Sequence, residues 1–413
     1  MFLHLLILLF FVPIFVHAEN LPRVEHHDPI IVDAKLSLSQ LVESTLEKYP
    51  DSQWLNALEN EVAALKQRGD SWTAGASTAG LKFQEATSGT LHYFDGTVEV
   101  PLWNLGQRDA TQRISEKAQF DSTMQVALTK WRVAGLIRAA LWDISLQELR
   151  HEQAKTELTA AEQLAHDVKR RVQAGDLAQT EELLAQTEVL KKRSGLMLAE
   201  AEVMHARKRY NAITQTANVP ADFQEKLSLQ KEIEPNHPAL QAVNSQIERK
   251  QAELDALQLV GSGQSSVAIG INSDRPSNQD ARSNNTESFN IGINVPFGGQ
   301  AHLAPQVAAL NVELNKLRAE RDHLFRELEQ NHHEAEHNLQ INQAELTISN
   351  ELKTVAEKHL KMTFVSFSVG EVDLIDLLKI QLQTQLAVLS AKERTIIVQR
   401  DFALYNQAVG VLP

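Results

Sequence analysis

The chain has 413 residues, of which 43% are hydrophobic and 23% are charged, a mixture typical of packed proteins rather than disordered ones. Its formal net charge of -13 disfavours nucleic acid as a partner, because binding to nucleic acid depends on cationic side chains that neutralise phosphates. The absence of cysteine excludes disulfides, thiolate metal sites and a lipid-attachment cysteine. Stability must therefore come from packing or from assembly.

The first residues of the chain resemble a secretory leader. Residues 1–15 are almost entirely apolar, and Val16-His17-Ala18 is the small-x-small pattern that signal peptidase reads. We predict a signal peptide at residues 1–18; an uncleaved anchor is the alternative, because the segment begins without Lys or Arg. No other stretch approaches the roughly 18 to 20 apolar residues that a membrane-spanning helix needs, so a mature chain that enters a membrane must do so as β-strands.

The remainder of the sequence is interpreted as a duplication. Three pairs of similar segments are each separated by 195 residues, which is too long a period for a solenoid repeat. The pairs are Val100-Pro101-Leu102 with Val295-Pro296-Phe297, Ala174-Gly175-Asp176 with Val369-Gly370-Glu371, and Tyr210-Asn211 with Tyr405-Asn406. We predict a first structural repeat at 19–213, a linker at 214–236 and a second repeat at 237–413.

Each repeat is predicted to contain a helix, two strands and a long helical hairpin. Alternating apolar residues, as at Phe289, Ile291 and Ile293, indicate strands. The expected strands are at about 72–83 and 91–100 in the first repeat and at about 264–273 and 287–296 in the second. The expected hairpins, which reverse at Gly175 and Gly370, are at about 104–213 and 299–409. A helix from Gln107 to Val172 would reach roughly 100 Å.

These elements predict a mainly α fold with a small β part that cannot be complete in one chain. Four strands are too few to close a membrane barrel, and open sheet edges are too costly in lipid, so several chains must share one barrel. Three chains would give twelve strands. Two alternatives remain open: a small soluble sheet attached to a helical bundle, and a periplasmic coiled-coil scaffold.

Several segments resemble the TolC family of outer membrane efflux proteins, also called outer membrane factors. They are Leu36 to Val42 before Tyr49-Pro50, the run Val-Pro-Leu-Trp-Asn-Leu-Gly-Gln-Arg from Val100 to Arg108, and the glycine-centred turns. The likeness covers nearly all of the mature chain, and the short length and Pro296-Phe297-Gly298 are most similar to the cobalt-zinc-cadmium heavy-metal efflux branch.

This resemblance implies a homotrimer without catalytic centre or cofactor. It implies a 12-stranded β-barrel in the outer membrane of a Gram-negative bacterium, continued by a long periplasmic α-helical barrel. It also implies a periplasmic adaptor (membrane fusion) protein and an inner-membrane transporter of the RND type as partners. The expected function is that of a passive exit duct, with heavy-metal cations as candidate substrates.

The resemblance also implies functional residues at the two helical turns. The residues expected to contact the adaptor are Arg171, Val172, Ala174, Gly175, Asp176 and Leu177 at the first turn, and Phe367, Val369, Gly370, Glu371 and Val372 at the second. Glu181 and Asp376 each lie six residues after their glycine, so three chains would place six carboxylates around one opening. Such a ring predicts a gate sensitive to cations and pH. Ordinary solvated carboxylates are the alternative.

One further motif matches a zinc-protease pattern. His333-Glu334-Ala335-Glu336-His337 has the HExxH form, which on a helix places both histidines on one face. An exported zinc metalloprotease is therefore the alternative function, and a transient metal contact or a solvated helix surface are alternative roles for His333 and His337. We favour a protein that is not an enzyme, because the motif is expected midway along a long polar helix, away from any cleft.

Overall fold

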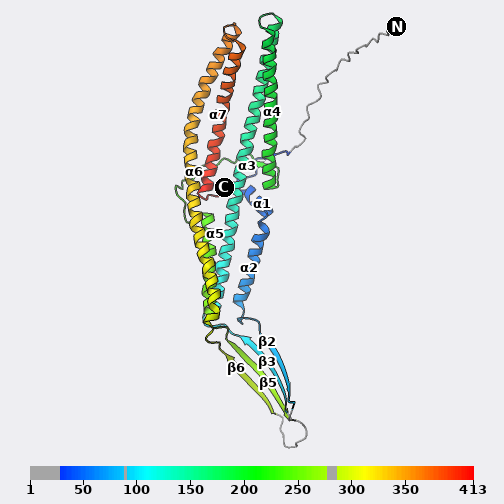
Figure 1. Cartoon of the computed structure of the whole chain (residues 1–413), viewed down its shortest axis with the longest axis vertical. Coiled ribbons are helices and arrows are strands. Elements are labelled where there is room, and N and C mark those ends of the chain that lie inside the picture. The colour runs from blue at the N-terminus through cyan, green and yellow to red at the C-terminus, as the bar shows by residue number, and fades with distance from the viewer. Residues whose placement is uncertain (1–27, 88–90, 277–285) are drawn as a thin grey trace, which may run out of the picture.

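The computed structural model describes residues 28–87, 91–276 and 286–413, so the predicted signal peptide lies outside the described residues. The molecule is elongated, with a β-sheet at one end and the turns of two helical hairpins at the other (Figure 1). No helix within the described ranges is long and apolar enough to cross a membrane.

The two halves of the chain share one order of elements, a helix, two strands and a long helical hairpin, and the first half has an additional helix, α1. The first half contains α1 (Leu38–Lys48), α2 (Ser52–Asp70), β2 (Thr78–Glu85), β3 (Leu91–Pro101), α3 (Gln107–Gln173) and α4 (Gln179–Thr214). The second half contains α5 (Pro238–Val260), β5 (Ser266–Pro276), β6 (Thr286–Asn294), α6 (Gln300–Ser368) and α7 (Leu374–Ala408). Two short strands, β1 (Ile31–Asp33) and β4 (Asn218–Pro220), pair in parallel.

One predicted strand boundary was wrong. Strand β2 begins at Thr78 and not at residue 72, because the preceding segment forms a local turn: the Ser71 hydroxyl donates to the Thr73 carbonyl at 3.0 Å, and the Ser71 carbonyl accepts from the Trp103 indole at 3.0 Å. The segment predicted as a linker at 214–236 joins α4 to α5, and it contains β4, which pairs with β1.

The helices form a single curved wall (Figure 1). In the half that bears the hairpin turns, the contacts run from α4 to α3, then to α7 and to α6. In the half nearer the sheet they run from α2 to α3, then to α5 and to α6. The sheet continues this order as β2-β3-β5-β6. One edge of the chain is therefore formed by α4, α2 and β2, and the other by α6 and β6.

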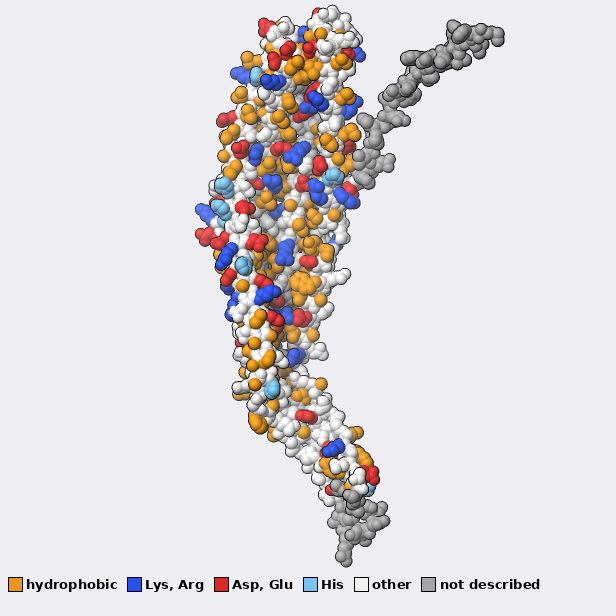
Figure 2. Space-filling view, viewed as in Figure 1, with side chains coloured by type: hydrophobic (Ala, Val, Ile, Leu, Met, Phe, Trp, Pro, Cys, Tyr) orange, Lys and Arg blue, Asp and Glu red, His pale blue; other side chains and the backbone are white. Residues whose placement is uncertain are grey.

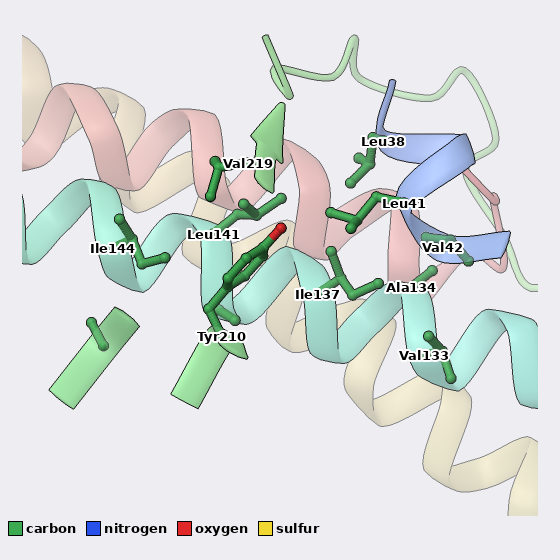
Figure 3. Packing of buried hydrophobic residues seen from close by; sticks show 12 residues of the cluster. Leu38, Leu41, Val42, Val133, Ala134, Ile137, Leu141, Ile144, Tyr210 and Val219 are labelled. Carbon is green, nitrogen blue, oxygen red and sulfur yellow. The ribbon is translucent and has the colours of Figure 1, made fainter. Parts of the chain in front are cut away.

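A buried cluster at mid-height fixes α1 and the β1-β4 pair to the wall. Figure 3 shows Leu41 and Val42 of α1 lying against Ile137 and Val133 of α3, and all four side chains are fully buried. Tyr210 of α4 is also fully buried, and its hydroxyl donates to the Asn218 carbonyl of β4. The apolar contacts stabilise this junction, and the hydroxyl bond sets where β4 docks.

A buried ion pair connects α3 to the segment after β4 and to the C-terminus. Arg138 is 1% exposed, and its guanidinium donates to both carboxylate oxygens of Glu225, at 2.8 and 2.6 Å. It also donates to the Gln407 side chain at 2.5 Å and to the Val411 carbonyl at 3.1 Å. Because the charge is compensated only by these partners, losing one of them leaves a buried cation unpaired.

We therefore predict that Glu225→Gln lowers the free energy of unfolding by about 3 kcal/mol, measured by denaturant titration in detergent. The same substitution at Glu393, whose partner Arg150 is 44% exposed, is the matched control and should cost less than about 1 kcal/mol. Equal losses in the two variants would contradict the role given to Arg138.

His237 caps the N-terminus of α5 from a buried position. It is 1% exposed, its Nδ1 accepts from the Ala239 backbone N–H at 3.2 Å, and its ring packs edge-on to Trp131 with centroids 5.1 Å apart. Burial lowers the pKa of His237 to about 4, against about 6.5 for an unperturbed histidine. Between these two values the unfolded chain binds a proton that the folded chain does not.

Stability should therefore fall as the pH is lowered from about 6.5 to 4. His237→Gln removes the titrating group, so the variant should lose less stability than the wild-type chain over this window. Denaturant titrations at pH 7.5 and pH 5 would measure the difference. An unchanged pH dependence in the variant would show that other groups cause the loss.

Candidate functional site

In both hairpins the first helix, α3 or α6, ends in the same glycine-centred turn. At the first turn the Gly175 and Asp176 N–H groups donate to the carbonyls of Val172 and Arg171, at 3.0 and 2.9 Å. The second turn repeats this pattern, with φ of 85° at Gly175 and 81° at Gly370. This is the Schellman arrangement, in which glycine takes the left-handed conformation at low cost.

We predict that Gly175→Ala and Gly370→Ala each destabilise their turn by about 1 kcal/mol through backbone strain alone, because a Cβ at either position meets nothing within 4 Å. Hydrogen exchange of the turn amides is the direct readout. Gly195→Ala is the matched control, since Gly195 lies in the interior of α4 with equally open space and alanine favours a helix. Faster exchange should appear only in the turn variants.

The structure brings the two predicted adaptor-contacting turns together at one end of the wall. Arg171 of the first hairpin donates to the Phe367 carbonyl of the second at 3.2 Å, and its guanidinium lies 4.9 Å from the centre of the Phe367 ring. Beneath this contact, the two hairpins share a small apolar core. Its buried members are Leu164, Val168, Ala185, Phe367, Leu374 and Leu377.

A pocket of about 300 Å³ opens between the two hairpins at this end. Its lining combines apolar and charged side chains: Leu164, Asp167, Arg170, Arg171, Ala174, Asp176, Phe364, Phe367 and Ser368. Val369 beside it is 67% exposed, and Gly370 and Glu371 are also exposed. The turns thus present a mixed polar and apolar surface, of the kind that a protein partner could cover.

The two predicted gate carboxylates occupy equivalent places. Glu181 lies in the first turn of α4 and Asp376 in the first turn of α7, where the helix dipole stabilises negative charge. Glu181 is half-buried, and its Oε2 has no hydrogen-bond partner among the described residues. Asp376 is exposed, and its backbone N–H donates to the Asp373 side chain at 2.8 Å.

The sheet at the opposite end has one apolar and one polar face. Residues paired directly across neighbouring strands have side chains on the same face, so the pairing of β2, β3, β5 and β6 assigns each side chain to one of the two faces. The apolar face carries Ala79, Leu81, Phe83, Phe94, Val98, Val100, Val267, Ile269, Ile271, Phe289, Ile291 and Ile293. The polar face carries Thr78, Lys82, Gln84, Tyr93, Asp95, Thr97, Glu99, Ser266, Asn272, Asn290 and Asn294, with glycines between them.

The apolar face has no cover in the single chain. Leu81 is 81% exposed, Ile291 63% and Ile293 69%. Further from the helices the same face becomes polar, where Glu85, His92 and Arg275 pair across it. An apolar band bounded by polar residues is typical of a strand surface that meets lipid.

Exposed hydrophobic residues also line the two edges of the helical wall, and Figure 2 shows such side chains along it. Helix α4 exposes Leu183, Leu190 and Met197, and helix α6 exposes Ile341, Ile348, Val355 and Met362. Both sets repeat every seven residues, the spacing of a coiled-coil seam. This signal is present in the sequence, but which helices form the edges is known only from the fold.

No family model and no curated protein matches the chain, but solved structures have a similar fold. The outer membrane protein VceC from Vibrio cholerae superposes with a TM-score of 0.70 at 12% identity, covering 91% of this chain and 97% of VceC. The open-state MtrE outer membrane channel of Neisseria gonorrhoeae gives 0.67 at 13% identity, covering 91% and 89%. CusC, studied for its transmembrane channel formation, gives 0.70 at 12% identity, covering 91% and 92%.

At these identities the similarity shows the fold. The chain has the fold of these outer-membrane channels, as the sequence resemblance to the TolC family implied. CusC, OprN and VceC are equally similar to this chain in fold, with a TM-score of 0.70 each. Membership of the heavy-metal efflux branch therefore stays a prediction.

Proposed function

We propose that this chain is the subunit of a channel in the outer membrane of a Gram-negative bacterium, formed by three identical copies. The observation that carries the proposal is the two-faced sheet, in which β2 and β6 each pair on one side only among the described residues. Its apolar face fits lipid and its polar face fits a water-filled lumen. Unpaired backbone groups at β2 and β6 could not remain open in lipid, so each edge must pair with another copy.

The helical edges support the same assembly. The stripe on α4 lies at one edge of the chain and the stripe on α6 at the other, so one copy would present α4 to α6 of the next. Such head-to-tail contacts close into a ring if the rotation permits it. Three copies of a four-stranded sheet give twelve strands, enough for a barrel with a lumen.

The channel would serve as the passive exit duct of a tripartite efflux system. The exposed turns around Arg171 and Phe367 would contact a periplasmic adaptor protein, and an inner-membrane transporter of the RND type would supply the energy. Heavy-metal cations are the proposed substrates, on the basis of the sequence resemblance alone. The polar lumen face includes carboxylates at Asp95 and Glu99, which favour passage of cations over anions.

Two adjacent residues of β6 test the assignment of the two sheet faces to lipid and lumen, because their side chains lie on opposite faces. Ile291→Arg places a charge on the proposed lipid face and should cost about 2–4 kcal/mol of insertion free energy, while Asn290→Arg places it on the proposed lumen face at little cost. Membrane fractionation and the yield of detergent-extracted trimer measure both. Equal behaviour of the two variants, or a water-soluble wild-type monomer, would contradict the proposal.

The gate is tested by neutralising both carboxylates together. In planar bilayers Glu181→Gln with Asp376→Asn should raise conductance or weaken block by divalent cations, because six fewer charges would then line the constriction in the trimer. Unchanged conductance and block would rule out the gate and leave the two residues with their helix-terminal role. A complete lack of conductance in the wild-type protein would instead favour the coiled-coil scaffold.

A further inference from the structure

The strongest feature that the channel proposal leaves unused is a pair of histidines on α6. His333 and His337 are both exposed, their ring centroids are 6.1 Å apart, and the ring planes differ by only 28°. They lie near the middle of α6, which runs from Gln300 to Ser368, so the backbone that carries them is held by helix on both sides. Figure 2 shows histidine side chains along the α6 margin of the molecule, about midway along the helices.

We propose that His333 and His337 form a two-imidazole binding site for a divalent transition-metal ion, with Cu²⁺ as the preferred ion. Metal–nitrogen bonds of about 2 Å require the two ligating nitrogens to lie roughly 3 Å apart. Exposed rings on adjacent turns of one helix can reach this separation by rotating about their side-chain bonds, without movement of the backbone. Imidazole ligands favour Cu²⁺, Ni²⁺ and Zn²⁺ over Mg²⁺ and Ca²⁺, and Cu²⁺ binds most tightly in the divalent series.

The neighbouring polar side chains have other contacts, which leaves the two imidazoles as the ligands. The Glu334 carboxylate accepts from Gln330 at 2.9 Å, one turn earlier on the helix. His332 lies 3.3 Å from the Tyr405 hydroxyl, which itself donates to the Gln230 carbonyl at 2.7 Å. Within the part of the chain that the structure describes, no group of three or more metal-binding side chains is found. Water would complete the coordination.

The same contacts separate metal binding from the protease alternative. A zinc hydrolase of the HExxH type needs a third protein ligand and a glutamate placed as general base. Here the Glu334 carboxylate is directed to Gln330 along the helix surface. The motif therefore supplies a site that holds an ion without the arrangement that would activate water on it.

The proposal is tested by titrating the purified full-length protein in detergent with Cu²⁺ alone and measuring the heat of binding by calorimetry. His333→Ala and His337→Ala should each weaken binding about tenfold or more, since losing even a group that only supports a metal ligand costs 10–100-fold. His323→Ala is the matched control, because His323 is exposed on the same helix, and should leave the affinity unchanged. Circular dichroism verifies that each variant keeps its helix content.

A second variant tests the spacing directly. His337→Ala combined with Asn338→His keeps the number of histidines but moves the second imidazole about 140° away from His333 around the helix, so binding should stay weak. Moving it to the i+3 position, with His337→Ala and Glu336→His, should restore much of the affinity. Unchanged Cu²⁺ affinity in the His333→Ala/His337→Ala double variant would overturn the proposal. Both ligands come from one helix, so this result is independent of whether the protein forms a channel.

Discussion

The free edges of the β-sheet are the constraint on which the rest of the structure depends. Strands β2 and β6 end the sheet with unpaired backbone groups, and the sheet exposes a complete apolar face on one side. A soluble protein would cover such a face and protect such edges. The described residues of this chain do neither, which is why we propose that the sheet is one segment of a larger cylinder, with lipid on its apolar face and a lumen on its polar face.

The helical wall extends the same geometry away from the sheet. Each sheet edge continues into a helical edge with a seven-residue apolar stripe, on α4 at one side and on α6 at the other. Within one copy, the buried clusters at mid-height and at the hairpin turns hold the helices in register. The Arg138–Glu225 pair then fixes the segment after β4 onto the wall.

Much of this architecture could be predicted from the sequence, because it depends on local patterns. Alternation at Phe289, Ile291 and Ile293 indicated a strand, and the left-handed glycines at 175 and 370 marked the turns. The start of β2 was missed, since the turn at Ser71 depends on a hydrogen bond from Trp103, which lies 32 residues later in the chain. The Arg171–Phe367 contact joins residues almost two hundred positions apart, and no local pattern indicates it.

The most direct test of the central claim is cross-linking between the two sheet edges. The chain has no cysteine, so Ala79→Cys in β2 combined with Ile291→Cys or Ile293→Cys in β6 introduces the only thiols. In membranes treated with a short bis-maleimide, we expect covalent dimers and trimers for at least one pair, and none for either single-cysteine variant. Covalent products confined to the monomer in both pairs would contradict the account, because edges that join different copies must link different chains.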